Sequence, residues 1–508
     1  MVQLAFIKRN TYQDSVRLMR LTERVKRVQG VVRAMAIMGT ENNKFTMSRA
    51  GFDVSLMKEA KPNDILFLVE AQSQSDAQSA WELYQNALGE HKEGDSSTSS
   101  RTVSVHRAAK LLKGANLALI SVPGNYAPYE AYKALREGLH VHIFSDNVSL
   151  EDEIRLKELG RREGLLVMGP DCGTSIINGV PICFANEVAR GTIGIVGASG
   201  TGIQEVSVLI DKLSAGVSHA IGVGGRDLTD EVGGITSLMA LDLMETDPET
   251  HTIVLLSKLP GTKTLDRLTE KIRDISKPVV LCFLGVNPQN LHGVKHFTDT
   301  LEGAALEAVK LSRGNKHSGG LAFSSAESES ENALLSKLPA TRKYIRGLYS
   351  GGSLASETFY ILKKYIEGVH FNPQSTPSMH AIVDMGSDEF TQGRPHPMID
   401  PSYRTERLLK EWNDPEVAII LLDVVLGYGS HENPAAPLAD SVIRAREKYN
   451  DNVIVIASVC GTERDPQQLS AQETQLREAG VLVYPTNARA AEAAVHYLSI
   501  CRERSQIQ

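Results

Sequence analysis

Two short turns of small residues each join an apolar strand to a helix, and each could bind an anion. The first turn follows the apolar segment TIGIVGA (192–198). The second begins at Ser350, the last residue of the segment YIRGLYS (344–350). Helix N-terminal amides lack internal partners and lie at the positive end of the helix dipole, so an oxyanion can approach them where glycine leaves the backbone uncovered. The presence of two such turns, each opening an α/β unit, suggests that two helix N-termini converge on one anion across a domain interface; two independent serine-capped corners would give the same pattern. The predicted phosphate-binding residues are Ser199, Gly200, Thr201, Gly202, Ser350, Gly351, Gly352 and Ser353.

Four side chains in loops after predicted strands are candidates for catalysis. For Arg226, the alternative to anion binding is an ion pair with Asp227 or Asp230; for a lone histidine, the alternative is a structural role. The four candidates are Arg226, Arg394, His396 and His431. The strand-end loops also contain Gly224, Gly225, Gly427, Gly429, Ser430, Gly461 and Thr462.

The elements that must position these loops alternate between strand and helix from residue 116 onward. Continuous apolar strands followed by glycine-rich turns are typical of parallel sheets covered on both faces, which bind ligands at the carboxyl ends of their strands. Before this region, a β-α-β-β-α pattern predicts a small ferredoxin-like module. Polar, serine-rich stretches at 91–101 and 314–340 predict linkers.

Composition excludes several classes of protein. The 508 residues carry 54 Lys+Arg against 61 Asp+Glu, which argues against nonspecific nucleic-acid binding. We find no apolar run long enough to cross a membrane and no secretory signal peptide at the N-terminus. The five cysteines form no CxxC pair, which favours reduced thiols in the cytoplasm; among them, Cys172 fits a small packing residue better than a nucleophile.

Several segments resemble the α subunit of succinyl-CoA synthetase, and the C-terminal part resembles the ligase domain of its β subunit. The first likeness is carried by GLLVMGPDCGT (164–174), GTIGIVGASGTG (191–202), IGVGGRDL (221–228) and KPVVLCFLG (277–285), and the second covers 344–500. A closer resemblance, to the FdrA proteins, adds YQDSV (12–16), MGTENNK (38–44), FSDNVSLEDE (144–153), GRPHPMIDP (393–401) and CGTERDP (460–466).

The resemblance implies an α/β fold with a Rossmann-like domain of the CoA-binding type, two flavodoxin-like domains and the ferredoxin-like module. The implied boundaries are 1–100 for the ferredoxin-like module, 101–190 for the Rossmann-like domain, 191–315 for the first flavodoxin-like domain, 316–343 for a linker and 344–508 for the second flavodoxin-like domain.

The chain also departs from the synthetase pattern. In that family, the two matching turns point at a phosphohistidine in a GHAGA motif, which this chain lacks; His292 and His296 are the histidines of the matching region. The turn that carries an orienting glutamate in the family reads SKLPG (257–261) here. The nucleotide-binding ATP-grasp domain and the N-terminal CoA phosphate loop are also missing from the sequence.

Retained anion turns without a phosphohistidine favour phosphate as a substrate. The FdrA resemblance implies a subunit of an oxamate carbamoyltransferase, which moves a carbamoyl group between a donor such as oxalurate and phosphate. In that reading Arg226 or Arg394 orients phosphate, and His396 or His431 protonates the leaving nitrogen. The alternatives are an NDP-forming acyl-CoA synthetase that uses CoA and a separate nucleotide-binding subunit, and a non-catalytic phosphate- or CoA-binding scaffold. Partner subunits are expected; no spacing marks a metal site, and a Mg²⁺ requirement stays open.

Overall fold

The structure is a computed structural model that describes residues 1–507, except for 12, 14, 27, 41–42, 45–46, 49–50, 90–103, 292, 315–338, 340, 374–377, 392–394 and 450–451. The described chain forms two compact units, Met1–Arg101 with Asp388–Pro395 and Thr102–Ser387 with His396–Gln508. The predicted linkers lie largely outside the described residues, and so do the candidates Arg394 and His292.

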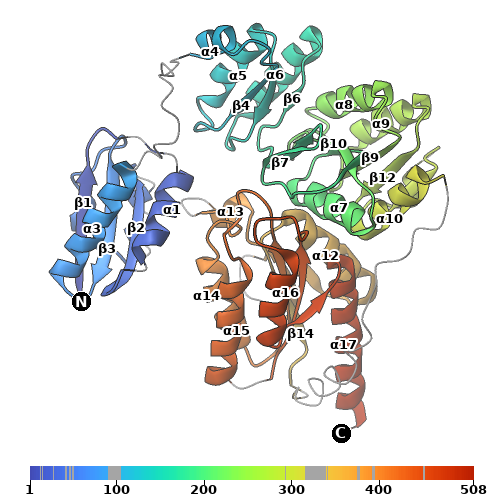
Figure 1. The fold of residues 1–508 in the computed structure, drawn as a ribbon. Helices are drawn as coiled ribbons and strands as arrows, with labels where there is room; N and C mark the ends of the chain where they lie inside the picture. The colour runs from blue at the N-terminus through green and yellow to red at the C-terminus, as the bar shows by residue number, and fades with distance from the viewer. Residues whose placement is uncertain are drawn as a thin grey trace. The chain divides into compact units, whose positions relative to one another are not determined.

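The first unit contains a three-stranded antiparallel sheet in the order β1-β3-β2, coloured blue in Figure 1. Its elements follow the predicted β-α-β-β-α order. They are β1 (Val2–Lys8), α1 (Ser15–Lys26), β2 (Val31–Met38), a 3-10 turn (Val54–Met57), β3 (Ile65–Ala71) and α3 (Gln74–Gly89). Trp81 and Tyr84 of α3 pack on Phe67 of β3, so the helices cover one face of this sheet.

The second unit begins with a small parallel sheet, β4-β5-β6. Alanines on one side of α5 are fully buried against it, including Ala127, Ala131 and Ala134. The elements are α4 (Val105–Leu111), β4 (Leu117–Ile120), α5 (Ala127–Arg136), β5 (His140–Ile143), α6 (Leu150–Glu163) and β6 (Val167–Met168).

A seven-stranded sheet follows, in the order β13-β12-β11-β9-β10-β7-β8. The five strands β9–β13 run parallel, and the β7–β8 hairpin adds an antiparallel edge. Val254 and Leu256 face one core and Ile253 and Leu255 the other, so both faces are covered. The strands are β7 (Thr174–Ile177), β8 (Val180–Cys183), β9 (Arg190–Gly197), β10 (Val217–Gly222), β11 (Thr252–Ser257), β12 (Val279–Phe283) and β13 (His296–Thr298); the helices are α7 (Gly200–Lys212), α8 (Ile235–Thr246), α9 (Thr262–Asp274) and α10 (Leu301–Ser312).

The last sheet has six parallel strands in the order β15-β16-β14-β17-β18-β19. Its central strand β17 is buried along its whole length, as expected for a strand covered on both faces. The strands are β14 (Tyr344–Tyr349), β15 (Val369–Phe371), β16 (His380–Asp384), β17 (Val417–Val425), β18 (Ile454–Cys460) and β19 (Leu482–Tyr484); the helices are α12 (Gly352–Tyr365), α14 (Ser402–Trp412), α15 (Ala435–Tyr449), α16 (Leu469–Glu478) and α17 (Asn487–Ile507). The short helix α13 (Asp388–Thr391) follows β16 in the chain but belongs to the first unit.

One apolar core joins the seven-stranded and six-stranded sheets. It contains Val206 and Leu209 of α7, Ala304 of α10, Leu354 of α12 and Ala491 of α17. The predicted α/β class with parallel sheets is therefore confirmed. Among the described residues, no helix combines the length and apolar character that crossing a bilayer requires.

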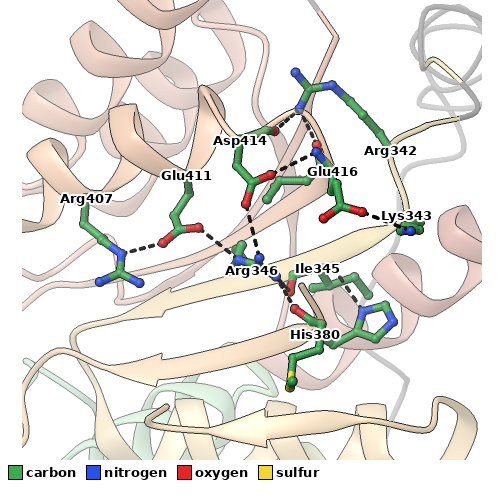
Figure 2. A network of polar contacts seen from close by, with 11 residues as sticks. Arg342, Lys343, Ile345, Arg346, His380, Arg407, Glu411, Asp414 and Glu416 are labelled. Atoms are coloured by element: carbon green, nitrogen blue, oxygen red, sulfur yellow. Dashed lines mark hydrogen bonds and ion pairs between the residues drawn. The ribbon is translucent and has the colours of Figure 1, made fainter. Parts of the chain in front are cut away.

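A buried ion network lies at the amino end of the six-stranded sheet (Figure 2). Arg346 of β14 is 1% exposed; its Nε lies 2.9 Å from Glu411 Oε2 and its Nη2 lies 3.4 Å from Asp414 Oδ2. Arg407 also pairs with Glu411. These contacts hold α14 and the loop after it on the sheet, at the end opposite the predicted phosphate-binding turns.

Candidate functional site

The two predicted turns lie in direct contact. Ser199 caps α7 by accepting a hydrogen bond from the Gly202 amide at 3.0 Å, and its Oγ also contacts the Oγ of Ser353. The Ser353 amide donates to Thr201 Oγ1 at 3.3 Å. The N-termini of α7 and α12, which belong to different sheets, therefore form one junction.

An internal carboxylate occupies part of the α12 turn. Asp423 accepts hydrogen bonds from the amides of Ser350 (2.8 Å) and Gly351 (2.7 Å), and from the Ser350 hydroxyl. Asp423 is fully buried and pairs with the buried Arg404 at 2.6 Å. Ser350 and Gly351 therefore shape the turn, but their amides are not available to a ligand.

Other amides at the junction remain available. Gly200 and Thr201 are the first residues of α7 and Gly352 is the first of α12, so their amides have no acceptor within their own helices. Within the described part of the chain, no other group accepts from these three amides. They are the backbone donors that an oxyanion could use.

The side chains of Lys258 and Asp384 also lie at the junction, and neither residue was predicted from the sequence to belong to the site. A Cβ built on Gly352 would lie 2.5 Å from Asp384 Oδ2 and 3.1 Å from Lys258 Nζ, so both side chains approach the start of α12 closely. Lys258 Nζ lies 4.0 Å from Asp384 Oδ2, and half of the lysine side chain is exposed. One ammonium and two positive helix ends here face one partly compensating carboxylate, an arrangement that favours an added anion.

His396 lies beside the α12 turn. A Cβ on Gly386 would lie 2.5 Å from His396 Nε2 and 2.6 Å from the Ser350 carbonyl oxygen. His396 Nδ1 accepts from the Met398 amide at 3.2 Å, which places the ring hydrogen on Nε2. Burial lowers the pKa of His396 to about 4, although Asp423 opposes the shift. A neutral His396 can donate one hydrogen bond to a substrate oxygen or nitrogen.

We expect the His396 ring to titrate only near pH 4. Its pKa in the unfolded chain is near 6.5, so folding stability due to the neutral ring is fully present above pH 6.5 and is lost as the pH falls toward 4. Carbon-bound ring protons in NMR spectra, assigned with His396→Gln, would measure this. A midpoint above 6 would contradict the burial of the ring.

His431 forms hydrogen bonds with the backbone of its own loop and of the segment around Met398. His431 Nδ1 accepts from the Asn433 amide at 3.0 Å, and the His431 amide donates to the Met398 carbonyl at 2.8 Å. The neighbouring Gly427 and Gly429 have positive φ values of 108° and 83°. They let the backbone pass the Ala185 carbonyl and the Phe184 ring, where a Cβ would clash.

The loop after β18 holds the segment before β9. Thr462 Oγ1 donates to the Glu187 carbonyl at 2.7 Å, and Asp465 accepts from Asn186 Nδ2 and the Glu187 amide, each at 2.8 Å. Gly461 packs against Leu426. The candidates Thr462 and Gly461 thus join two parts of the chain, with no contact to the helix junction among these bonds.

Arg226 lies in a different ion cluster. Its Nε lies 2.8 Å from Glu153 Oε2 and its Nη2 donates to the Val148 carbonyl at 2.8 Å. The alternative partners expected from the sequence were Asp227 and Asp230; instead, the fully buried Lys157 binds Asp227 at 2.6 Å. With Gly224 (φ 86°) and Gly225 beside it, this loop fastens α6 to the seven-stranded sheet.

Cys172 and His296 also lie away from the junction. Cys172 is buried, its Sγ lies 3.3 Å from His142 Nε2, and burial raises the pKa of its thiol to about 12. A thiol that stays protonated fits the predicted packing role. His296 lies on the edge strand β13, with Nδ1 3.0 Å from Glu307 Oε1.

Comparison with known proteins defines the class. Residues 348–497 match a family described as CoA-ligase, 189–285 match a CoA binding domain, and 1–104 match "AllF, heavy metal-associated domain". The CoA-binding match therefore falls on the seven-stranded sheet, rather than on residues 101–190. Fold and matches together define an α/β protein of the succinyl-CoA synthetase type.

Individual proteins also resemble this chain, and one of them does so over nearly its whole length. The chain is 40% identical over 497 residues to the uncharacterized protein YahF of Escherichia coli K12, covering 94% of this chain and 95% of that protein. It is 30% identical over 179 residues to the α subunit of an ADP-forming succinate–CoA ligase of Aquifex aeolicus, covering 34% of this chain and 57% of that one. An acetyl-coenzyme A synthetase of Candidatus Korarchaeum cryptofilum matches with 16% identity and a TM-score of 0.30, covering 78% of this chain and 86% of that one. The chain belongs to the FdrA family, as its sequence motifs indicated.

The matched N-terminal domain is named for heavy metals, but its residues do not suit a thiolate site. Residues 1–104 contain no cysteine and a single histidine, His91. Across the described residues, no three His, Cys, Asp or Glu side chains gather in a way that could hold a metal ion.

Proposed function

We propose that this chain is a subunit of a carbamoyltransferase that moves a carbamoyl group between an N-carbamoyl donor, such as oxalurate, and inorganic phosphate. The observation that supports the proposal is the α7–α12 junction, where the tip of α7, with the available amides of Gly200 and Thr201, contacts the tip of α12, where the Lys258 ammonium approaches Gly352. The sequence predicted that Ser350 and Gly351 would bind phosphate, but their amides donate to the Asp423 carboxylate instead.

In the proposed reaction, a phosphate oxygen attacks the carbamoyl carbon and forms a C–O bond. Charge develops on the carbonyl oxygen of the tetrahedral intermediate, and fixed amide donors stabilise such charge at little reorganisation cost. The C–N bond then breaks, its electron pair stays on nitrogen, and nitrogen takes a proton to leave as a neutral amide. Lys258 would hold the phosphate. The attacking phosphate, as HPO4²⁻, carries the proton that the leaving nitrogen takes, and the Nε2–H of neutral His396 would donate a hydrogen bond to that nitrogen.

The test is a product assay with the full-length chain and its partner subunits. Oxalurate and inorganic phosphate should give carbamoyl phosphate and oxamate, with a rate that depends on phosphate. Replacing phosphate with sulfate should abolish the product. If no phosphate-dependent product forms from oxalurate, the proposed reaction is wrong. We also propose that the reaction takes place in the cytoplasm, a reducing compartment in which cysteines such as these five, which form no disulfide, stay as thiols.

An NDP-forming acyl-CoA synthetase activity, with a nucleotide-binding subunit on another chain, is the second candidate. The matches to CoA-ligase and CoA binding domains and the succinate–CoA ligase relative favour it. Calorimetric titration of the chain with CoA, and incubation with labelled ATP and partners, would distinguish the two. CoA binding together with a phosphohistidine would replace the first proposal with this one.

A further inference from the structure

Behind the helix junction, three buried glutamates meet the start of α17. Glu205 of α7, Glu302 of α10 and Glu357 of α12 are 3%, 9% and 1% exposed. Glu205 and Glu357 each follow the first residue of their helix by five positions, about 7.5 Å along the axis at about 1.5 Å per residue. The two glutamates therefore lie about one and a half helical turns behind the two tips.

Asn487 joins the two helices. Its side-chain amide donates to Glu357 Oε2 at 2.7 Å and to the Leu354 carbonyl at 3.0 Å, both on α12. Its backbone amide donates to Glu205 Oε1 on α7 at 3.3 Å. Glu357 Oε1 in turn accepts from the Leu301 amide at the start of α10 at 2.6 Å.

The third glutamate, Glu302, forms an ion pair with Arg489 in the same cluster. Glu302 Oε1 lies 2.6 Å from Arg489 Nη2, and Glu302 Oε2 accepts from Thr486 Oγ1 at 2.7 Å. Arg489 and Thr486 belong to the six-stranded half, and Glu302 to the seven-stranded half. The hydrogen bonds of Glu205 to Asn487, of Glu302 to Thr486 and Arg489, and of Glu357 to Leu301 therefore all connect the region of the seven-stranded sheet with that of the six-stranded sheet.

We infer that Asn487 is a positioning residue, which with Glu205 and Glu357 forms a proton-dependent latch that fixes how the tips of α7 and α12 meet. Three carboxyl groups are buried here: Arg489 pairs with Glu302 and Lys212 faces Glu205, whereas none of the groups that act on Glu357 among the described residues is a cation, so Glu357 is the group that takes up a proton. The other ionisable groups facing Glu205 are Lys212 on α7 and Cys460 on β18. Those facing Glu357 are Cys282 on β12 and Tyr349 on β14. The inference holds whatever anion the tips bind.

The ionisation of the two glutamates supports the latch. Burial raises the pKa of Glu357 to about 8, against hydrogen bonds from Asn487 and Leu301, and Glu205 and Glu302 raise it further. Burial also raises the pKa of Glu205. The unfolded value is near 4.5, so stability due to neutral Glu357 is fully present below pH 4.5 and is lost as the pH rises through 8. This direction is opposite to that of His396.

Amide hydrogen exchange in the full-length chain would test the latch, at pH 6.0 and pH 8.5 with intrinsic rates corrected. The wild-type amides of Gly202, Ile203 and Ser353, which donate hydrogen bonds at the two tips, should lose protection at the higher pH. Asn487→Asp adds a fourth carboxyl group, and should increase that loss at least about tenfold, the equivalent of one pKa unit. Glu357→Gln, which cannot ionise, should make protection the same at both values of pH.

Matched exposed positions provide controls. Glu492→Gln on α17 and Asn413→Asp after α14 make the same chemical changes at exposed positions. In both variants, the protection of the tip amides should depend on pH as it does in the wild type. If Glu357→Gln keeps the wild-type difference between pH 6.0 and 8.5, the latch is wrong, even where Asn487→Asp fails to fold. Equal protection of Asn487→Asp and wild type at pH 8.5 would also overturn it.

Discussion

Lys258→Gln is expected to weaken the binding of inorganic phosphate by about ten- to a hundredfold, since a charged hydrogen bond contributes about 1.5–3 kcal/mol. The lysine ammonium approaches Gly352 at the tip of α12 and lies 4.0 Å from the Asp384 carboxylate. Without it, the added anion faces Asp384 with helix amides alone. Calorimetric titration of the full-length chain with phosphate, at low and moderate salt, measures the change.

Lys263→Gln is the matched control for Lys258. Lys263 is exposed on α9 and its replacement removes the same charge, but it is not among the groups that approach Gly352 in the described structure, so affinity should stay within about twofold because an exposed charge is screened by salt. Equal affinity of Lys258→Gln and wild type would show that Lys258 is not a ligand. A wild-type chain that binds no phosphate would contradict the site itself, and with it the proposed reaction.

Arg346→Ala should destabilise the six-stranded half by about 3–5 kcal/mol, the usual cost of removing one partner from a buried ion pair. Of the two arginines that contact Glu411 in Figure 2, the substitution leaves only Arg407, although Glu411 is itself 1% exposed. It also removes a large buried side chain without filling its volume. Trp412 is fully buried on the same helix. Its fluorescence in a Trp81→Phe background reports urea unfolding of this half, since the chain has two tryptophans.

Lys343→Ala is the corresponding control in the same strand region. Lys343 lies 3.0 Å from Glu416, but its side chain is 52% exposed, and exposed pairs contribute at most about 1 kcal/mol. A loss of stability in Arg346→Ala no larger than in Lys343→Ala would mean that the buried network does not hold α14 in place.

The fold was largely predictable because its signals are local. Apolar strands such as 252–257 and 417–425 are continuous in sequence, and buried parallel strands require that pattern. The small-residue turns at 199–202 and 350–353 were likewise visible, since a tight strand-to-helix connection needs glycine and a capping serine. The β7–β8 hairpin was not predicted to join the next sheet, because pairing partners leave no local trace.

The site was predicted only in part. His396 lies beside the turn before α12, and its catalytic role stays a prediction. Arg226 binds Glu153 on a helix far from it in sequence, and a lone arginine does not reveal its partner. Lys258 and Asp384 were missed because each follows its strand without any motif. Their role depends on two sheets meeting, which no spacing along the chain records.

By itself, the sequence determined that helices would begin at two glycine-rich turns and present amides there, because backbone conformation and capping depend on neighbouring residues. Which of those amides stay available was decided by tertiary structure alone. Asp423, from a strand distant in sequence, takes the amides of Ser350 and Gly351, and Lys258 reaches the tip of α12 from the other sheet. Hydrogen bonds and charges act through space, so only the packed chain fixes their partners.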